Sequence, residues 1–242
     1  MTDCSWLSNR LKYSIEILGI FHMTSVRISK EHQSSADEKV KSLRKKPVQS
    51  RSQMTLTSLQ DAFVRVLIDK GYEAMTIREV AAVAGIGIGT FYDYAPNMRS
   101  LAASTINQRC MSAAHKLKDF VEVQDGLTLE KMVQALLGKL CELGFSTPRE
   151  WTAILLLERQ VSSASALRKI HEEYASIWEL ALRNSNFSIP EYAIKSIARM
   201  AHAISYGWYS HDLLFYLDQP RESRTIEEIG DAIVGFIKAR ST

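Results

Sequence analysis

Apolar residues recur every three or four positions along most of the chain after residue 57, which is the spacing of an amphipathic helix. Neither the alternation typical of a half-buried strand nor an internal repeat is seen. The pattern predicts helices over 57–70, 76–84, 87–94, 99–123, 129–143, 151–161, 167–182 and 190–217, and a last helix capped by Thr225. The sequence therefore predicts an all-α fold.

The most specific local pattern begins at Thr76. Thr76 and Glu79 have the spacing of a capping box, in which each side chain binds the backbone N–H of the other residue. Gly85 then suits the left-handed conformation that ends a helix and turns the chain. A second short helix follows, with Phe91 as its apolar anchor. Two short helices around a glycine turn are typical of a helix-turn-helix, and the preceding helix completes a three-helix unit.

Length and composition are those of an ordinary globular protein. The chain has 242 residues, of which 46% are apolar and 24% charged, enough for one compact domain or two small ones. The segment Tyr13–Met23 is the one candidate for a membrane span, but it is too short and contains Glu16. It also lacks a small-residue cleavage site, so a secretory signal is not expected.

The three cysteines are Cys4, Cys110 and Cys141, and they have no metal-binding spacing. Their odd number favours a reducing, cytoplasmic compartment. Cys110 has two open interpretations, a redox sensor or a buried structural thiol. The sequence predicts no metal site, no cofactor and no catalytic residue.

Positive charge is concentrated at the N-terminal end. The formal net charge is +3, yet residues 1–51 hold ten Lys and Arg against five Asp and Glu. We expect residues 1–50 to be a largely disordered basic arm, because their mixed polar composition cannot bury enough surface to fold alone. A basic run before a helix-turn-helix suits phosphate attraction and minor-groove entry; the alternative is a solvated tail. A further hypothesis is that translation begins at Met23.

The run DKGYEAMTIREVAAVAGIGIGTFYDYAPNMRSL, residues 69–101, resembles the N-terminal domain of the TetR family of bacterial transcriptional regulators. The resemblance covers about residues 52–101, and the rest of the chain shows only the general helical plan of that family. It implies a helix-turn-helix DNA-binding domain over 51–98 and a helical effector-binding and dimerisation domain over 99–242. It also implies a cytoplasmic bacterial protein that is nucleoid-associated when bound to DNA.

The resemblance also assigns DNA contacts. Thr76 would bond a phosphate, while Thr90 and Tyr92 would meet phosphates and base edges. Glycines at the start of the recognition helix would allow close approach and leave Ile88 to read a methyl group. The expected set is Arg44, Lys45, Lys46, Arg51, Thr76, Gly87, Ile88, Gly89, Thr90, Tyr92, Tyr94 and Arg99. Alternatively, the two tyrosines pack on neighbouring helices.

The middle helices are dense in aromatic and soft side chains with a few polar groups among them, which is typical of a small-molecule pocket and also of an ordinary core. The candidates for effector contact are Met111, His115, Trp151, Arg159, Tyr174, Trp178, His202 and Trp208. Their composition favours a largely apolar or aromatic effector.

The last two helices carry an apolar stripe with small residues, which suits either a homodimer interface or an intramolecular core. The candidates for dimerisation are Ile194, Ile197, Ala201, Ile204, Ile229, Ile233 and Ile237. Because family members generally pair their last two helices, the resemblance favours a four-helix bundle between two subunits.

These features together predict a dimeric repressor that a small, apolar effector releases from a pseudo-palindromic operator in double-stranded DNA. One alternative is a ligand-independent dimeric DNA-binding regulator. A remote alternative is a helical small-molecule enzyme with Glu158 and His171 or His115 as acid and base. No nucleophile elbow, phosphate loop or metal spacing supports that alternative, so the chain is not expected to be an enzyme.

Overall fold

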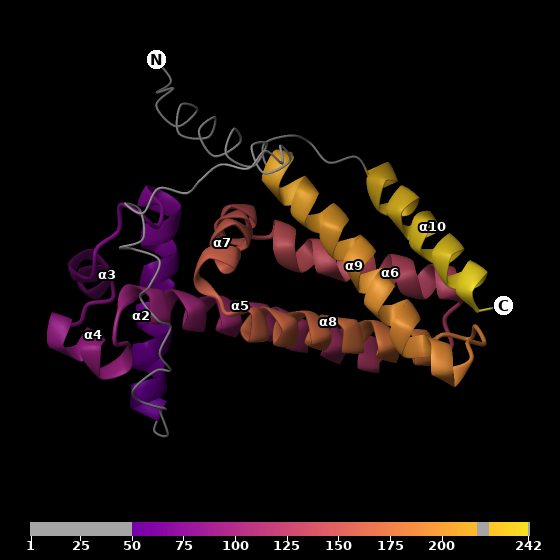
Figure 1. Cartoon of the computed structure of the whole chain (residues 1–242), viewed down its shortest axis with the longest axis horizontal. Coiled ribbons are helices and arrows are strands. Elements are labelled where there is room, and N and C mark those ends of the chain that lie inside the picture. Colours follow the sequence, from indigo (N-terminus) through magenta and orange to yellow (C-terminus); the bar gives the residue numbers. More distant parts are fainter. Residues whose placement is uncertain (1–49, 217–222, 242) are drawn as a thin grey trace, which may run out of the picture. The chain divides into compact units, whose positions relative to one another are not determined.

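The computed structural model of the protein describes residues 50–216 and 223–241, and within these ranges it contains helices and no β-strand (Figure 1). The helices are α2 (Ser50–Lys70), α3 (Ile77–Val83), α4 (Ile88–Tyr94), α5 (Met98–Glu122), α6 (Leu129–Phe145), α7 (Pro148–Val161), α8 (Ala164–Asn184), α9 (Glu191–Phe215) and α10 (Ser223–Arg240). The prediction of an all-α fold is confirmed. No helix in the described ranges is both long enough and apolar enough to cross a bilayer.

Local sequence explains where the short helices begin and end. The capping box of Thr76 and Glu79 is formed at the start of α3, as predicted. Gly85 has φ +70°, and Gly71 after α2 has φ +76°, so both turns use the left-handed region that glycine adopts without strain. Asn97 caps α5 by accepting the backbone N–H of Ser100.

The structure differs from the predicted boundaries mainly at helix starts. Helix α2 begins at Ser50 rather than Thr57, and Leu56 in this added stretch packs against the N-terminal core. Helix α7 begins at Pro148 rather than Trp151, since proline suits a first helical turn that needs no backbone donor. Helix α10 begins at Ser223, two residues before the predicted cap.

Two clusters of buried apolar residues hold the described chain together. The N-terminal core joins α2, α3 and α4 to the first half of α5 and to α7. Its fully buried large residues are Leu59, Phe63, Phe91, Leu101, Ile106 and Ile154. The C-terminal core joins the second half of α5 to α6, α8, α9 and α10, with Leu129, Met132, Leu137, Ile177 and Ile197 fully buried.

Helix α5 is therefore shared by both cores. Leu101 and Ile106 lie in the N-terminal core, whereas Leu117 and Val121 lie in the C-terminal core. The helix packs against α2, α6, α7 and α8, and Figure 1 shows it running beside α8. A rigid movement of α5 would therefore displace side chains in both cores, because packed interiors transmit displacement.

Candidate functional site

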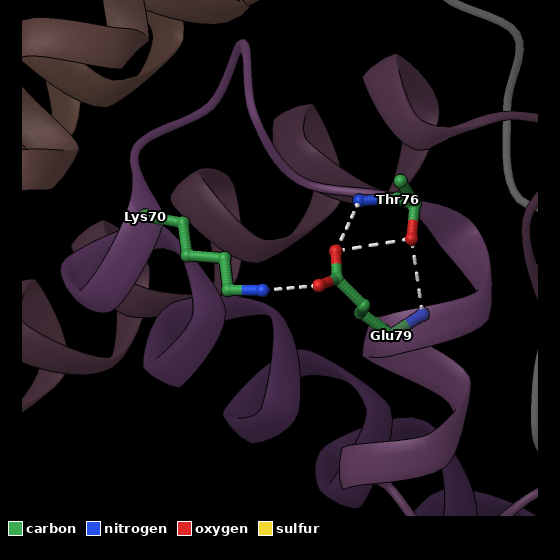
Figure 2. Close-up of polar contacts among 3 residues, drawn as sticks. All are labelled: Lys70, Thr76 and Glu79. Atoms are coloured by element: carbon green, nitrogen blue, oxygen red, sulfur yellow. Dashed lines mark hydrogen bonds and ion pairs between the residues drawn. The ribbon is translucent and has the colours of Figure 1, made fainter.

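The start of α3 is held by a polar cluster that also reaches α2 (Figure 2). The Thr76 Oγ1 atom accepts the Glu79 backbone N–H at 3.2 Å, and the Glu79 carboxylate accepts the Thr76 backbone N–H at 3.1 Å. Lys70 forms an ion pair with the same carboxylate. The hydrogen bond from Lys70, followed by those from Thr76, lowers the pKa of Glu79. Thr76 remains exposed, so its cap does not hide it from a phosphate.

Helix α4 presents one buried and one open face. Phe91 is fully buried in the N-terminal core, whereas Ile88 and Tyr92 are 40% and 42% exposed. Gly87 and Gly89 are exposed, and an added Cβ at either would meet no atom within 4 Å. Thr90 is half-buried beside them. The open face is therefore a short apolar surface formed by Ile88 and Tyr92, with exposed glycine backbone at the N-terminal end of the helix.

Two residues expected to contact DNA have polar contacts within the chain. Tyr94 is 5% exposed and belongs to the N-terminal core, and its hydroxyl lies 3.1 Å from the Ser52 Oγ atom. The Arg99 guanidinium donates to the Gln160 carbonyl oxygen at 2.8 Å, at the end of α7. Tyr94 is therefore a packing residue, and Arg99 joins α5 to α7. Arg44, Lys45 and Lys46 lie outside the described residues, as does the side chain of Arg51.

A cavity opens among α5, α6, α7, α8 and α9. The cavity is narrow: its volume is about 60 Å³, within a wider region of about 820 Å³ of non-atom space that includes open solvent. The walls are mostly aliphatic and aromatic. Of the residues expected there, Trp151, Tyr174, Trp178 and His202 line it.

The other candidates for effector contact lie elsewhere. His115 and Arg159 are exposed and neither lines the cavity, although Arg159 hydrogen-bonds the hydroxyl of Tyr206 in its wall. Met111 packs against the N-terminal core, and Trp208 packs against the C-terminal core. Other polar and aromatic residues also line the cavity. Glu158 and His171 are polar groups that the sequence pattern already marks on these helices, whereas Tyr206 and Tyr209 were not expected there. The spacing of His202, Tyr206 and Tyr209 along one helix face was the available signal.

The polar groups of the cavity form one connected cluster. The His171 Nδ1 and His202 Nε2 atoms are 3.0 Å apart, and the Tyr206 hydroxyl donates to the Glu158 Oε1 atom at 2.5 Å. The His171 ring meets the Tyr206 ring edge-on at 4.8 Å, which joins the two pairs. Burial, and then repulsion from His171, lowers the pKa of His202 to about 4. Burial, and then the bond to Glu158, raises the pKa of Tyr206.

Cys110 also lines the cavity, where burial followed by the charge of Glu158 raises its pKa to about 12. A thiol that remains protonated at neutral pH is a poor nucleophile. The structural interpretation of this cysteine is favoured over the redox sensor.

Comparison with known proteins identifies the helix-turn-helix unit. Residues 59–105 match the family model for bacterial regulatory proteins of the tetR family. Residues 59–105 of this chain are therefore similar to the DNA-binding domain of the TetR family.

Solved structures, among them TetR-family regulators, share the fold of this chain. A TetR family transcription regulator from Marinobacter aquaeolei VT8 is 14% identical with a TM-score of 0.61, covering 77% of this chain and 97% of that one. FadR from Bacillus subtilis, in complex with stearoyl-CoA, is 16% identical with a TM-score of 0.56, covering 75% and 97%. The multidrug binding protein EbrR, complexed with imidazole, is 20% identical with a TM-score of 0.56, covering 74% and 93%. No curated protein matches the sequence.

The stripe expected to pair two TetR-family subunits instead lies largely inside this one. Ile194, Ile197, Ala201, Ile233 and Ile237 are buried in the C-terminal core, while Ile204 and Ile229 are half-buried against it. The apolar stripe is the side of α9 and α10 that covers α6 and α8, so it is not free for a second copy. The outward sides of α9 and α10 carry other residues, among them Met200, Ala203, Gly207, Ala232 and Gly235, all exposed.

Proposed function

We propose that this TetR-family DNA-binding transcriptional regulator is a dimeric repressor, released from a pseudo-palindromic operator when a small organic effector enters the cavity. The observation that carries the proposal is the dual place of α5. Its first half packs on the DNA-binding helices, and its second half, with Ala113 and Leu117, lines the cavity. An effector that prefers one packing of the cavity helices therefore acts on the helix-turn-helix through a single rigid element.

Polar contacts support a second route between the proposed domains, residues 51–98 and 99–242. Arg109 of α5 forms an ion pair with Asp61 of α2 at 2.5 Å and lies 2.9 Å from the Glu150 carboxylate of α7. Arg99 ties α5 to the end of α7. Helix α7 borders both the cavity and the N-terminal core. Movement of α7 on effector binding would thus displace α5 and α2 together.

For the DNA side, the proposal rests on the open face of α4. Ile88 and Tyr92 can reach thymine methyl groups in a major groove, and the bare backbone of Gly87 permits close approach. Thr76 offers a hydroxyl to a phosphate. Because no basic side chain lies on α4, the N-terminal arm is proposed to supply much of the attraction to phosphates.

For the dimer, we assign the interface to the outward faces of α9 and α10. Small exposed residues on both helices let two helix pairs approach closely and form an isologous four-helix bundle. Two recognition helices at a fixed separation then read two half-sites one helical turn apart, which one short helix cannot do alone.

Selection of genomic DNA fragments by the purified full-length protein tests this function. We expect enrichment of fragments that share one pseudo-palindrome. Tyr92→Ala should weaken binding to that sequence by about tenfold, since it removes one apolar base contact. Val123→Ala is a matched control, because Val123 is 77% exposed at the far end of α5. No shared sequence, or equal effects of the two variants, would contradict the proposal.

A further inference from the structure

The cavity contains one formal charge among its lining residues, and that charge is negative. Glu158 is the one Asp, Glu, Lys or Arg in the wall, and it is only 4% exposed. Its carboxylate accepts one hydrogen bond, from the Tyr206 hydroxyl. Among the described residues it forms no salt bridge. A buried carboxylate with one neutral partner is poorly compensated, because burial removes the water that would otherwise solvate it.

The nearest basic side chains do not supply the missing charge. Arg159 is exposed and acts on the Tyr206 hydroxyl, whose pKa it lowers slightly against the larger effects of burial and Glu158. His202 stays neutral at physiological pH because its pKa is lowered to about 4. The Nδ1 atom of His171 is directed to His202 rather than to the carboxylate. We therefore expect a bound ligand to supply the positive charge that compensates the Glu158 carboxylate.

The walls around Glu158 suit a cation. Trp151, Tyr174, Trp178, Tyr206 and Tyr209 all line the same space, and the face of an aromatic ring attracts positive charge. A carboxylate or phosphate ligand would find no Lys or Arg in the lining to receive it. An anionic effector would also be repelled by the acid already there.

We propose that the effector of this regulator is a lipophilic organic cation, with an apolar or aromatic body and one charged nitrogen held against Glu158. This assignment rests on the proposed function, because it takes the cavity as the effector site. It separates this chain from FadR of Bacillus subtilis, whose structure holds stearoyl-CoA, an anionic thioester.

Three probes that share one body and differ in charge test the assignment. They are 4-phenylbutylamine, which is a cation at pH 7, 4-phenylbutanol, which is neutral, and 4-phenylbutyrate, which is an anion. Binding to the full-length protein is measured by calorimetry and by tryptophan fluorescence, since Trp151 and Trp178 line the cavity. We expect the amine to bind about tenfold more tightly than the alcohol, and the carboxylate to bind most weakly. Equal affinities, preference for the carboxylate, or no binding of any probe at millimolar concentration would overturn the assignment.

Two variants locate the source of the preference. Glu158→Gln keeps the shape of the side chain but removes its charge, so the amine should bind no better than the alcohol. Glu172→Gln is the matched control, because Glu172 is an exposed carboxylate beside His171 in the shallow groove outside α8 and α9. It should leave the amine affinity unchanged. Thermal unfolding of each variant shows that it is folded. A cation preference that survives Glu158→Gln, or is lost in Glu172→Gln, rejects Glu158 as the counter-ion.

Release of operator DNA separates failure of this inference from failure of the proposed function. If the alcohol or the carboxylate displaces the protein from its selected sequence better than the amine, the sensor function stands and the cationic class is wrong. If the protein selects no sequence, the regulator function fails independently of ligand charge. Amine binding that releases DNA in the wild-type protein and not in Glu158→Gln would support both.

Discussion

At the scale of single residues, the effect of a substitution on stability depends more on the surrounding space and contacts than on the residue type. Gly144 and Gly138 lie six residues apart on α6, yet their surroundings are opposite. A Cβ at Gly144 would lie 1.9 Å from the Tyr209 hydroxyl oxygen, whereas a Cβ at Gly138 would meet nothing within 4 Å. Tyr209 has little freedom to move aside, because it is 7% exposed and its ring stacks on Phe145 at 5.6 Å.

This contrast predicts opposite effects of one substitution. Gly144→Ala should lower the free energy of unfolding by about 1–3 kcal/mol, the usual effect of overpacking a filled site. Gly138→Ala should raise it by roughly 0.5–1 kcal/mol, because alanine loses less backbone entropy in a helix than glycine does. Chemical denaturation of both variants measures the two values. A Gly144→Ala protein as stable as Gly138→Ala would mean that Tyr209 relaxes without loss.

His202 gives a pH dependence with a definite sign. Its pKa falls from 6.5 in the unfolded chain to about 4 in the fold, because burial disfavours the charged ring. The folded state therefore binds fewer protons between these values, so its stability is full above pH 6.5 and is lost as pH falls toward 4. His202→Gln, whose amide can still bond His171, should flatten this loss. Denaturation midpoints of both proteins between pH 7 and pH 4.5 check it; parallel curves would contradict the assignment.

At the scale of elements, α3 depends on a cap and an ion pair that join it to α2. The capping box was readable in the sequence because Thr76 and Glu79 are three residues apart. The ion pair with Lys70 was not, since the turn between the helices brings that side chain back. A helix of seven residues has few internal hydrogen bonds, so contacts at its ends contribute a larger share of its stability.

Thr76→Ala should therefore cost about 1 kcal/mol, the typical loss of a helix N-cap. For a domain of this size the melting temperature should fall by roughly 2–4 °C. Thr76→Ser retains the hydroxyl and should restore most of the difference. Thermal unfolding followed by circular dichroism compares the three proteins. If Ser and Ala at this position melt together, the hydroxyl does not act as the cap.

At the scale of the whole molecule, a cavity made by five helices is joined to a DNA-binding unit through α5 and α7. The apolar sides of α9 and α10 pack inward and cover the C-terminal core. The opposite, exposed sides of these two helices are the surface proposed to bind a second copy. In the proposed function, dimer assembly and effector binding therefore use opposite faces of α9.

Charge on the outward face should separate assembly from folding. An added Cβ at Gly235 meets nothing within 4 Å, so Gly235→Glu should leave the subunit folded. Buried against its own symmetry mate, however, the new carboxylate would be desolvated and repelled. We expect a monomer by light scattering and a large loss of operator affinity. Val123→Glu, at a site 77% exposed, is the control and should remain dimeric. A dimeric Gly235→Glu protein would place the interface elsewhere.

The features that depend on near neighbours along the chain could be predicted from residue spacing. Helix positions, the capping box and the glycine turns follow from local backbone chemistry, and the helix-turn-helix pattern with its family resemblance lies in one continuous run. The exposure of Ile88 and Tyr92 opposite buried Phe91 also agrees with the helical spacing of this segment.

The partner of each apolar face, in contrast, could be assigned from the three-dimensional packing and not from residue spacing. Helical spacing marks a stripe as apolar but is the same for a core, a cavity wall and a subunit interface. The spacing therefore could not show that the stripe through Ile197 and Ile233 is buried within the subunit. Polar side chains find partners far along the chain, as Arg99 does at Gln160 and Tyr206 at Glu158. The free energy of such contacts depends on burial and distance in space, and neither is encoded in the spacing of residues along one helix.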